Sequence, residues 1–165
     1  TLILMGGYRR TRFISFLDPW QYSDKEGYQL IQSLTAIGSG GIFGKGLGNS
    51  SQKLFFLPEA HTDFIFSIIS EEFGLLGSLF VIVLVSWLFF LIVKTSFLHE
   101  DKFKRLLTLG IGLMIIYQSI IHIGVTVGML PTKGITLPLI SYGGSALVVQ
   151  LALMGILIRS IGELK

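Results

Sequence analysis

Three long stretches of the chain are almost free of charged side chains. They cover residues 73–93, 106–130 and 135–158, and His122 is their only histidine or charged residue. A bilayer core of about 30 Å needs about 20 consecutive apolar residues to be crossed by a helix. The pattern therefore predicts an all-α, polytopic membrane protein in which these stretches are the spans.

A shorter apolar pattern precedes them. In the segment Tyr28–Ile37, the apolar residues Leu30, Ile31, Leu34 and Ile37 recur at helical spacing, with polar residues between them. Such a helix is too short to span and suits a position in the membrane interface. The first residues, Thr1 to Met5, look like the tail of a further apolar helix. We therefore expect the chain to be the C-terminal piece of a larger protein.

Composition agrees with a membrane protein and excludes other classes. Hydrophobic residues make up 51% of the chain and charged residues 14%, against about 25% charged residues in a soluble domain. The chain has no cysteine, so disulfides and thiol chemistry are excluded. The cations behind the net charge of +3 are scattered among loops, which argues against a nucleic-acid-binding patch.

The cations of the short loops predict the orientation in the membrane. They cluster between the first two predicted spans and after the third, whereas Lys133 alone lies between the second and third. This places residues 94–105 and the C-terminus in the cytoplasm, and residues 6–63 outside. Arginines at positions 9, 10 and 12 oppose this orientation, but no apolar run between them and residue 56 could carry the chain back. We therefore divide the chain into residues 1–63, the end of an upstream membrane helix with a large extracytoplasmic loop, and residues 64–165, the C-terminal transmembrane helices.

The segment LPEAHTDFIFSIISEE, residues 57–72, brings acids to the outer end of the first span. Thr62 is expected to cap a helix with Asp63 in its first turn, and a polar stripe of Asp63, Ser67, Ser70 and Glu71 follows at helical spacing. Partial burial would make Asp63 a general base. Alternatively, Asp63 only caps the helix while the later glutamates pair with lysines or lipid headgroups.

Other residues of the outer segments are candidate ligands. Glu59 and His61 could join Asp63 around a divalent cation such as Mg²⁺ or Mn²⁺, although three ligands in one loop are weak support. The glycine-rich segment 38–53 carries Lys45 and Lys53, which could meet phosphate oxygens. Its alternative is a flexible lid without ligand contacts.

The third polar segment, GMLPTKGITLPLISYGGS at 128–145, interrupts the apolar pattern with two prolines and paired glycines. Irregular backbone at membrane depth is found where it is buried in protein or lines a wet cavity. Lys133 could contact an anion there, or it could simply extend to the interface. Gln118 and His122 are interpreted as interhelical hydrogen-bonding groups rather than catalysts.

An outer location restricts the chemistry. Nucleoside triphosphates are absent there, so a reaction needs a substrate that arrives already activated. A lipid-linked pyrophosphate that is made inside and moved across meets this requirement.

Two blocks, GLGNSSQKLFFLPEAHTDFIFSIISEEFGLLG and GMLPTKGITLPLISYGGSAL, together resemble the FtsW/RodA/SpoVE (SEDS) family of shape, elongation, division and sporulation proteins. The resemblance covers about residues 8 to 160. The tetrapeptide PTKG at 131–134 is more similar to the division and sporulation branch.

The resemblance implies the last three helices and the large outer loop of a ten-helix glycosyltransferase in the bacterial cytoplasmic membrane. Such an enzyme polymerises lipid II into peptidoglycan glycan strands, and its essential aspartate corresponds to Asp63. Lys45, Lys53, Glu59, His61 and Lys133 are expected to assist at the substrate. Expected partners are lipid II, a class B penicillin-binding protein transpeptidase, other division or elongation proteins and membrane lipids, with no nucleic acid. A lipid-linked precursor transporter and a non-catalytic scaffold remain alternatives.

Overall fold

In the computed structural model, the described part of the chain comprises residue 16 and residues 18–22, 26–52, 62–132 and 134–163. Its regular elements are all helices, with no strand among those residues. A short 3-10 helix η1 (Pro19–Tyr22) precedes α2 (Glu26–Gly40), which is followed by the long helices α3 (Ile65–Leu98), α4 (Lys102–Thr126) and α5 (Gly144–Gly162). The predicted all-α fold is confirmed.

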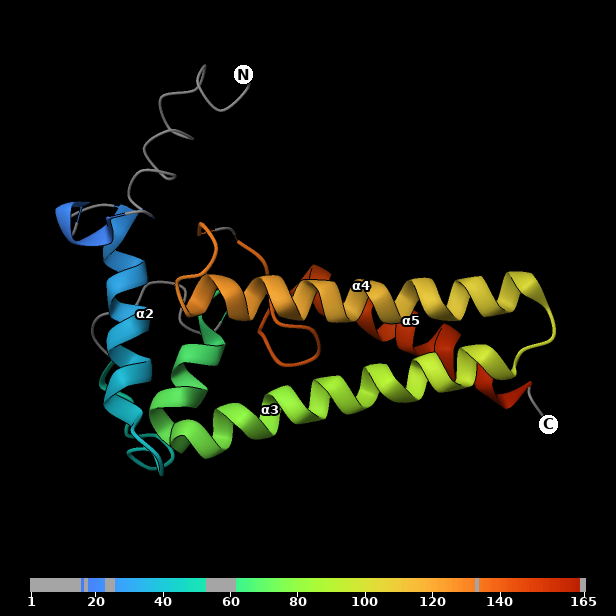
Figure 1. Ribbon diagram of the computed structural model, residues 1–165, viewed down its shortest axis with the longest axis horizontal. Helices are drawn as coiled ribbons and strands as arrows, with labels where there is room; N and C mark the ends of the chain where they lie inside the picture. Colours follow the sequence, from blue (N-terminus) through green and yellow to red (C-terminus); the bar gives the residue numbers. More distant parts are fainter. Residues whose placement is uncertain (1–15, 17, 23–25, 53–61, 133, 164–165) are drawn as a thin grey trace, which may run out of the picture.

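The three long helices form the body of the molecule. α3 and α4 run antiparallel along its long axis, with α5 against them, and α2 crosses one end at a steep angle (Figure 1). Each long helix is long and apolar enough to cross a membrane. Many of their large side chains point outward, including Phe80, Trp87 and Val148, each more than 60% exposed. This exposure suits contact with lipid or with further helices.

The helices extend beyond the predicted spans at four ends and fall short of them at two. α4 ends at Thr126 rather than near residue 130, and α5 begins at Gly144 rather than at residue 135. The physical reason is that Pro131 and Pro138 cannot donate backbone hydrogen bonds inside a helix. Residues 127–132 and 134–143 therefore form an irregular connection, although their composition is apolar enough to resemble part of a span.

α3 is bent, and the bend divides it into a short arm before Gly74 and a long arm after it. Gly74 has φ 68° and ψ −160°, which no helical residue adopts. The short arm packs alongside α2, whereas the long arm packs against α4 (Figure 1). The predicted short helix at 28–37 is confirmed as α2, which is two to three residues longer at each end. Its steep angle to the long helices is compatible with the predicted interfacial position.

The apolar core lies between these elements in three clusters. The central one joins Phe66 of the short arm, Val81 and Val85 of the long arm, and Leu137 of the irregular connection. Leu137 is completely buried. The connection is therefore folded into the helix bundle rather than laid over its surface.

Candidate functional site

The glycine-rich loop after α2, residues 41–52, hydrogen-bonds to the bend of α3 through the loop backbone. A straight helix would join the N–H groups of Leu75 and Leu76 to the carbonyls of Glu71 and Glu72. The bend breaks these two bonds. Lys45 and Gly46 donate to the two carbonyls at 2.9 and 3.0 Å. The carbonyls of Gly41 and Ile42 accept from the two N–H groups at 2.9 and 3.3 Å. The loop thus provides partners for these four backbone groups at the bend.

Two glycines make this close approach possible. A Cβ at Gly44 would lie 2.2 Å from the carbonyl oxygen of Glu72, and one at Gly74 would lie 2.4 Å from the backbone nitrogen of Gly44. Both residues also have left-handed φ angles, 81° and 68°, which favour glycine. The glycines were predicted to let the backbone approach a ligand, with a flexible lid as the alternative. In the structure, the backbone that they approach is that of α3.

A buried carboxylate completes the junction between loop and helix. The Glu71 side chain is fully buried. It accepts hydrogen bonds from Lys45 Nζ at 2.7 Å and from Ser50 Oγ at 2.5 Å. Ser39, Ser51 and the backbone nitrogen of Gln52 donate at 3.3–3.4 Å. We call this group of side chains the Glu71 network, comprising Glu71, Lys45, Ser39, Ser50, Ser51 and the Gln52 amide.

The rest of the predicted polar stripe on the short arm is also buried and hydrogen-bonded. Ser67 shares a 2.6 Å hydrogen bond with Ser33 of α2, which also donates to the carbonyl of Thr126 at 2.7 Å. Ser70 lies against Ser78 at 2.7 Å across the bend. The stripe thus ties the short arm to α2 and to the end of α4.

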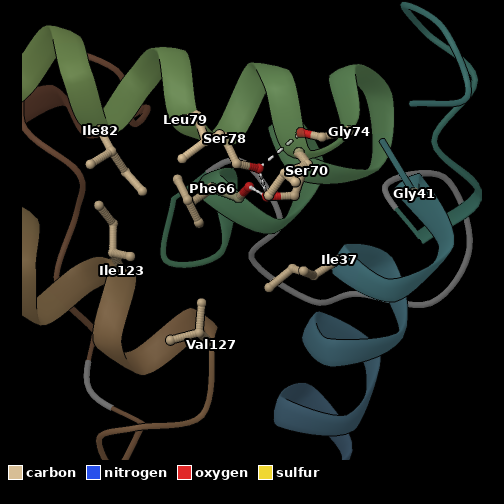
Figure 2. A pocket seen from close by; sticks show the side chains of 11 residues that line it. Ile37, Gly41, Phe66, Ser70, Gly74, Ser78, Leu79, Ile82, Ile123 and Val127 are labelled. Carbon is tan, nitrogen blue, oxygen red and sulfur yellow. Dashed lines mark hydrogen bonds between the residues drawn. The ribbon is translucent and has the colours of Figure 1, made fainter. Parts of the chain in front are cut away.

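An apolar cavity lies inside the bend. Figure 2 shows it between α2, both arms of α3 and the end of α4, with Ile37, Phe66, Ile123 and Val127 among its walls. Its volume is about 230 Å³. The hydroxyls of Ser70 and Ser78 at its edge are already hydrogen-bonded within the helix. The cavity therefore suits an apolar group and offers little polar chemistry.

Polar side chains of α4 and α5 hold the irregular connection between them. Gln118 donates to the carbonyl of Thr136 at 2.9 Å, and His122 Nδ1 lies 2.7 Å from the carbonyl of Ile135. Gln150 accepts from the backbone nitrogen of Leu139 at 2.8 Å. Leu139 has φ 63°, unusual for a residue with a side chain. These contacts agree with the interpretation of Gln118 and His122 as hydrogen-bonding groups between segments.

The connection brings the two sequence blocks together at Asp63. Ser141 Oγ donates to the carbonyl of Thr62 at 2.7 Å and accepts from the backbone nitrogen of Leu137 at 2.7 Å. A Cβ at Gly134 would lie 3.2 Å from Asp63 Oδ2, so the carboxylate lies directly against this glycine. Asp63 is partly buried. Two segments that are about seventy residues apart in sequence therefore meet at one carboxylate.

The start of α3 differs from the prediction. Thr62 was expected to be the N-cap, but the cap is Phe64, with no side-chain hydrogen bond, and Asp63 lies in the preceding turn. Phe64 and Phe66 are buried, so packing of these rings sets where the helix begins. Asp63 thus lies outside the helix, next to the positive end of the helix dipole.

Several predicted site residues lie outside the described residues, namely Lys53, Glu59, His61 and Lys133. Their roles, and the divalent cation site built on Glu59, His61 and Asp63, stay predictions. Within the described part of the chain, no group of three or more His, Cys, Asp or Glu side chains could hold a metal ion. Lys45 is described, and it contacts Glu71 while keeping about a third of its side chain exposed.

Sequence reasoning missed the role of Glu71. The residue was placed on the polar stripe, and pairing with a lysine was considered only as the alternative to a site at this end. The signal was present: an acid inside an apolar helix, and a lysine, serines and glycines in the preceding loop. What the sequence did not show was that the helix bends between them.

Comparison with known proteins decides the family. The model of the FtsW/RodA/SpoVE cell cycle proteins matches residues 1–164. This chain belongs to that family. It is 50% identical over 161 residues to the probable peptidoglycan glycosyltransferase FtsW of Haemophilus influenzae, covering 96% of this chain and 41% of the relative. It is also 50% identical over 167 residues to the protein of the same name from Buchnera aphidicola, covering 99% of this chain and 44% of the relative.

A solved structure has a fold similar to that of this chain. It is described as "Structural coordination of polymerization and crosslinking by a peptidoglycan synthase complex" and superposes with a TM-score of 0.77 at 29% identity. The match covers 97% of this chain and 43% of that one. The chain thus spans about two fifths of the length of the relatives that it matches. The predicted family is confirmed.

Proposed function

We propose that this chain carries the catalytic carboxylate of a peptidoglycan glycosyltransferase that polymerises lipid II. The observation that supports it is the meeting of Asp63 with Gly134, which joins the two blocks of the family resemblance at one partly buried acid. The similar proteins are named as probable peptidoglycan glycosyltransferases. We propose the activity for the whole protein, because this chain spans about two fifths of the length of its relatives.

In the proposed reaction, Asp63 is the general base. Its carboxylate takes the proton from the 4-hydroxyl of an acceptor GlcNAc, whose oxygen attacks the anomeric carbon of a second lipid-linked sugar. The bond from that carbon to the diphosphate breaks, and undecaprenyl pyrophosphate leaves with the electron pair. An α-linked donor gives a β-1,4 product by a single displacement. One carboxylate can therefore suffice, whereas a retaining reaction would also need a nucleophile.

The leaving diphosphate requires positive charge nearby. Lys133 is adjacent in sequence to Gly134, which contacts Asp63, and Lys53 follows the Glu71 network directly. We propose both as diphosphate contacts, with Glu59 and His61 as further helpers and cationic residues of the upstream helices as additional donors. Lys45 is the weaker candidate because its ammonium already binds Glu71.

The proposed reaction requires an extracytoplasmic site, with residues 6–63 outside and the C-terminus in the cytoplasm. The solved relative is part of a synthase complex that combines polymerisation with crosslinking. We accordingly propose a class B transpeptidase as the partner, and a role in division or sporulation wall synthesis.

The decisive experiment uses the full-length protein, purified with its transpeptidase partner and supplied with lipid II. Asp63→Asn should abolish glycan polymer while leaving the unfolding temperature and binding to the partner unchanged. Asp18→Asn is the matched control, since it removes an acid from the same outer part of the chain, and it should polymerise normally. Lipid II translocated without polymer would support the transporter instead. Full polymerisation by Asp63→Asn would overturn the proposed catalytic role and favour the scaffold.

A further inference from the structure

Resting on the proposed function, we infer that Glu71 is a positioning residue for Asp63, acting through the bend of α3. Its carboxylate fastens the glycine-rich loop to the bend, and the bend sets the direction of the short arm that Asp63 precedes. Glu71 itself contacts neither Gly134 nor the connection in the described contacts.

The loop and the bend stabilise each other. The loop makes four backbone hydrogen bonds to Glu71, Glu72, Leu75 and Leu76, the residues around Gly74. A backbone N–H or C=O group that is buried away from water without a hydrogen-bond partner is destabilising. A bent α3 is therefore stable only while the loop is in place, whereas a loop that leaves would favour straightening of the helix.

The Glu71 network holds the loop in place. Its members come from α2 (Ser39), from the middle of the loop (Lys45) and from its end (Ser50, Ser51 and the Gln52 amide). A single carboxylate thus joins the end of α2 to the middle and the end of the loop. It is fully buried, and hydrogen bonds to a buried charge are stronger than those between neutral groups.

The position of Asp63 depends on the direction of the bend. The short arm begins at Ile65, directly after the turn that contains Asp63. Its far end carries Glu71. A change in the bend rotates the short arm about Gly74 and displaces Asp63 from Gly134, on the separate connection after α4. A misplacement of about 1 Å can lower a rate by roughly 100-fold.

The test compares steady-state kinetics on lipid II for the full-length protein and its variants. Glu71→Gln keeps the size of the side chain but removes its charge. We expect kcat to fall by roughly 10- to 100-fold with KM for lipid II changed less than about twofold, because the residue does not contact substrate. Lys45→Met should lower kcat less, and the double variant should match Glu71→Gln alone, since both changes break one bond.

A structural readout is independent of activity. Spin labels at Leu47 of the loop and Leu84 of the long arm, both more than half exposed, report the distance across the bend. Glu71→Gln should broaden the distance distribution. If Glu71→Gln does not fold, Ser50→Ala removes one hydrogen bond of the network and should give a smaller change in the same direction. The matched control is Lys104→Met, which breaks the exposed Lys104–Glu163 pair at the other end of the molecule and should leave both readouts unchanged.

The outcomes separate this inference from the proposed function. If Asp63→Asn is inactive while Glu71→Gln keeps full kcat, the positioning role is wrong and the proposed base stands. A raised KM with unchanged kcat would also overturn it, because Glu71 or Lys45 would then act at the substrate. Full activity of Asp63→Asn would instead remove the proposed function itself.

Discussion

The two ends of the helix bundle differ in the burial of their charged side chains and in the regularity of their backbone. At the end that carries Asp63, Glu71 is fully buried and bound by several donors. At the other end, Glu163 pairs with Lys104 at 2.6 Å and with Arg159 at 3.3 Å, while 39% of its side chain remains exposed. A charge that is removed from solvent depends on its partners, whereas an exposed pair is screened.

The backbone differs in the same way. Near Asp63, α3 is bent and the connection after α4 is folded into the bundle, so their free backbone groups need partners from the loop and from polar side chains. At the opposite end, α4 begins at a simple cap in which Asp101 accepts from the backbone nitrogen of Phe103 at 2.8 Å. Buried polar side chains also occur at that opposite end, where Ser160 lies within hydrogen-bonding distance of Thr108 and His99. The bend, the folded-in connection and the buried Glu71 carboxylate, in contrast, lie at the end where we propose the chemistry.

The largest effect is expected when the buried charge is removed. Glu71→Leu leaves Lys45 and the serines without their acceptor and should lower the free energy of unfolding by about 3–5 kcal/mol. Glu163→Leu at the exposed end should cause no measurable change. Equilibrium unfolding of the full-length protein in mixed micelles provides the comparison. Equal losses for the two variants would contradict the contrast between the ends.

A second prediction concerns the fit of loop and bend. Gly44→Ala places a Cβ against the carbonyl of Glu72 in a left-handed conformation, and it should cost about 2–4 kcal/mol of unfolding free energy. Gly48 has a similar φ of 77° but nothing within 4 Å of its Cβ position. Gly48→Ala should therefore cost only the conformational strain, about 1 kcal/mol. If the two variants were equally stable, the loop would not contact α3 as described.

A third prediction tests how the connection is held. His122→Phe removes the group hydrogen-bonded to the carbonyl of Ile135 and should lower the free energy of unfolding by about 1–3 kcal/mol. Tyr117→Phe, on the same helix and 67% exposed, is the control and should have little effect. An unchanged stability for His122→Phe would show that other contacts suffice to seat the connection.

The smallest expected effect is the pH dependence of the exposed pair. The hydrogen bond from Lys104 holds the pKa of Glu163 below its ordinary value. A lowered pKa stabilises the folded state above the ordinary carboxylate pKa, and this contribution disappears as the pH falls through the lowered value. Because the group is exposed, the contribution should be slight and should vanish in high salt. Titration of Glu163 by NMR in wild type and in Lys104→Met would measure it, and identical pKa values would contradict the pairing.

Much of the helical framework follows from local sequence. Long apolar runs predict the bodies of α3, α4 and α5 because the cost of burying backbone in lipid leaves helices as the available structure. Helical spacing of Leu30, Ile31 and Leu34 predicts α2 for the same local reason. The boundaries at Thr126 and Gly144 were less predictable, since prolines signal an interruption without showing how far the irregular backbone extends.

The sequence by itself determined the membrane-spanning helices, the short crossing helix, the polar stripe with Asp63 and the family. Only the tertiary structure decided that α3 bends at Gly74, that the glycine-rich loop satisfies the bend, and that Asp63 lies against Gly134. Hydropathy and periodicity are local properties that neighbouring residues determine together. The four hydrogen bonds between the bend and a distant loop depend on where separate segments meet, and no local pattern encodes that meeting.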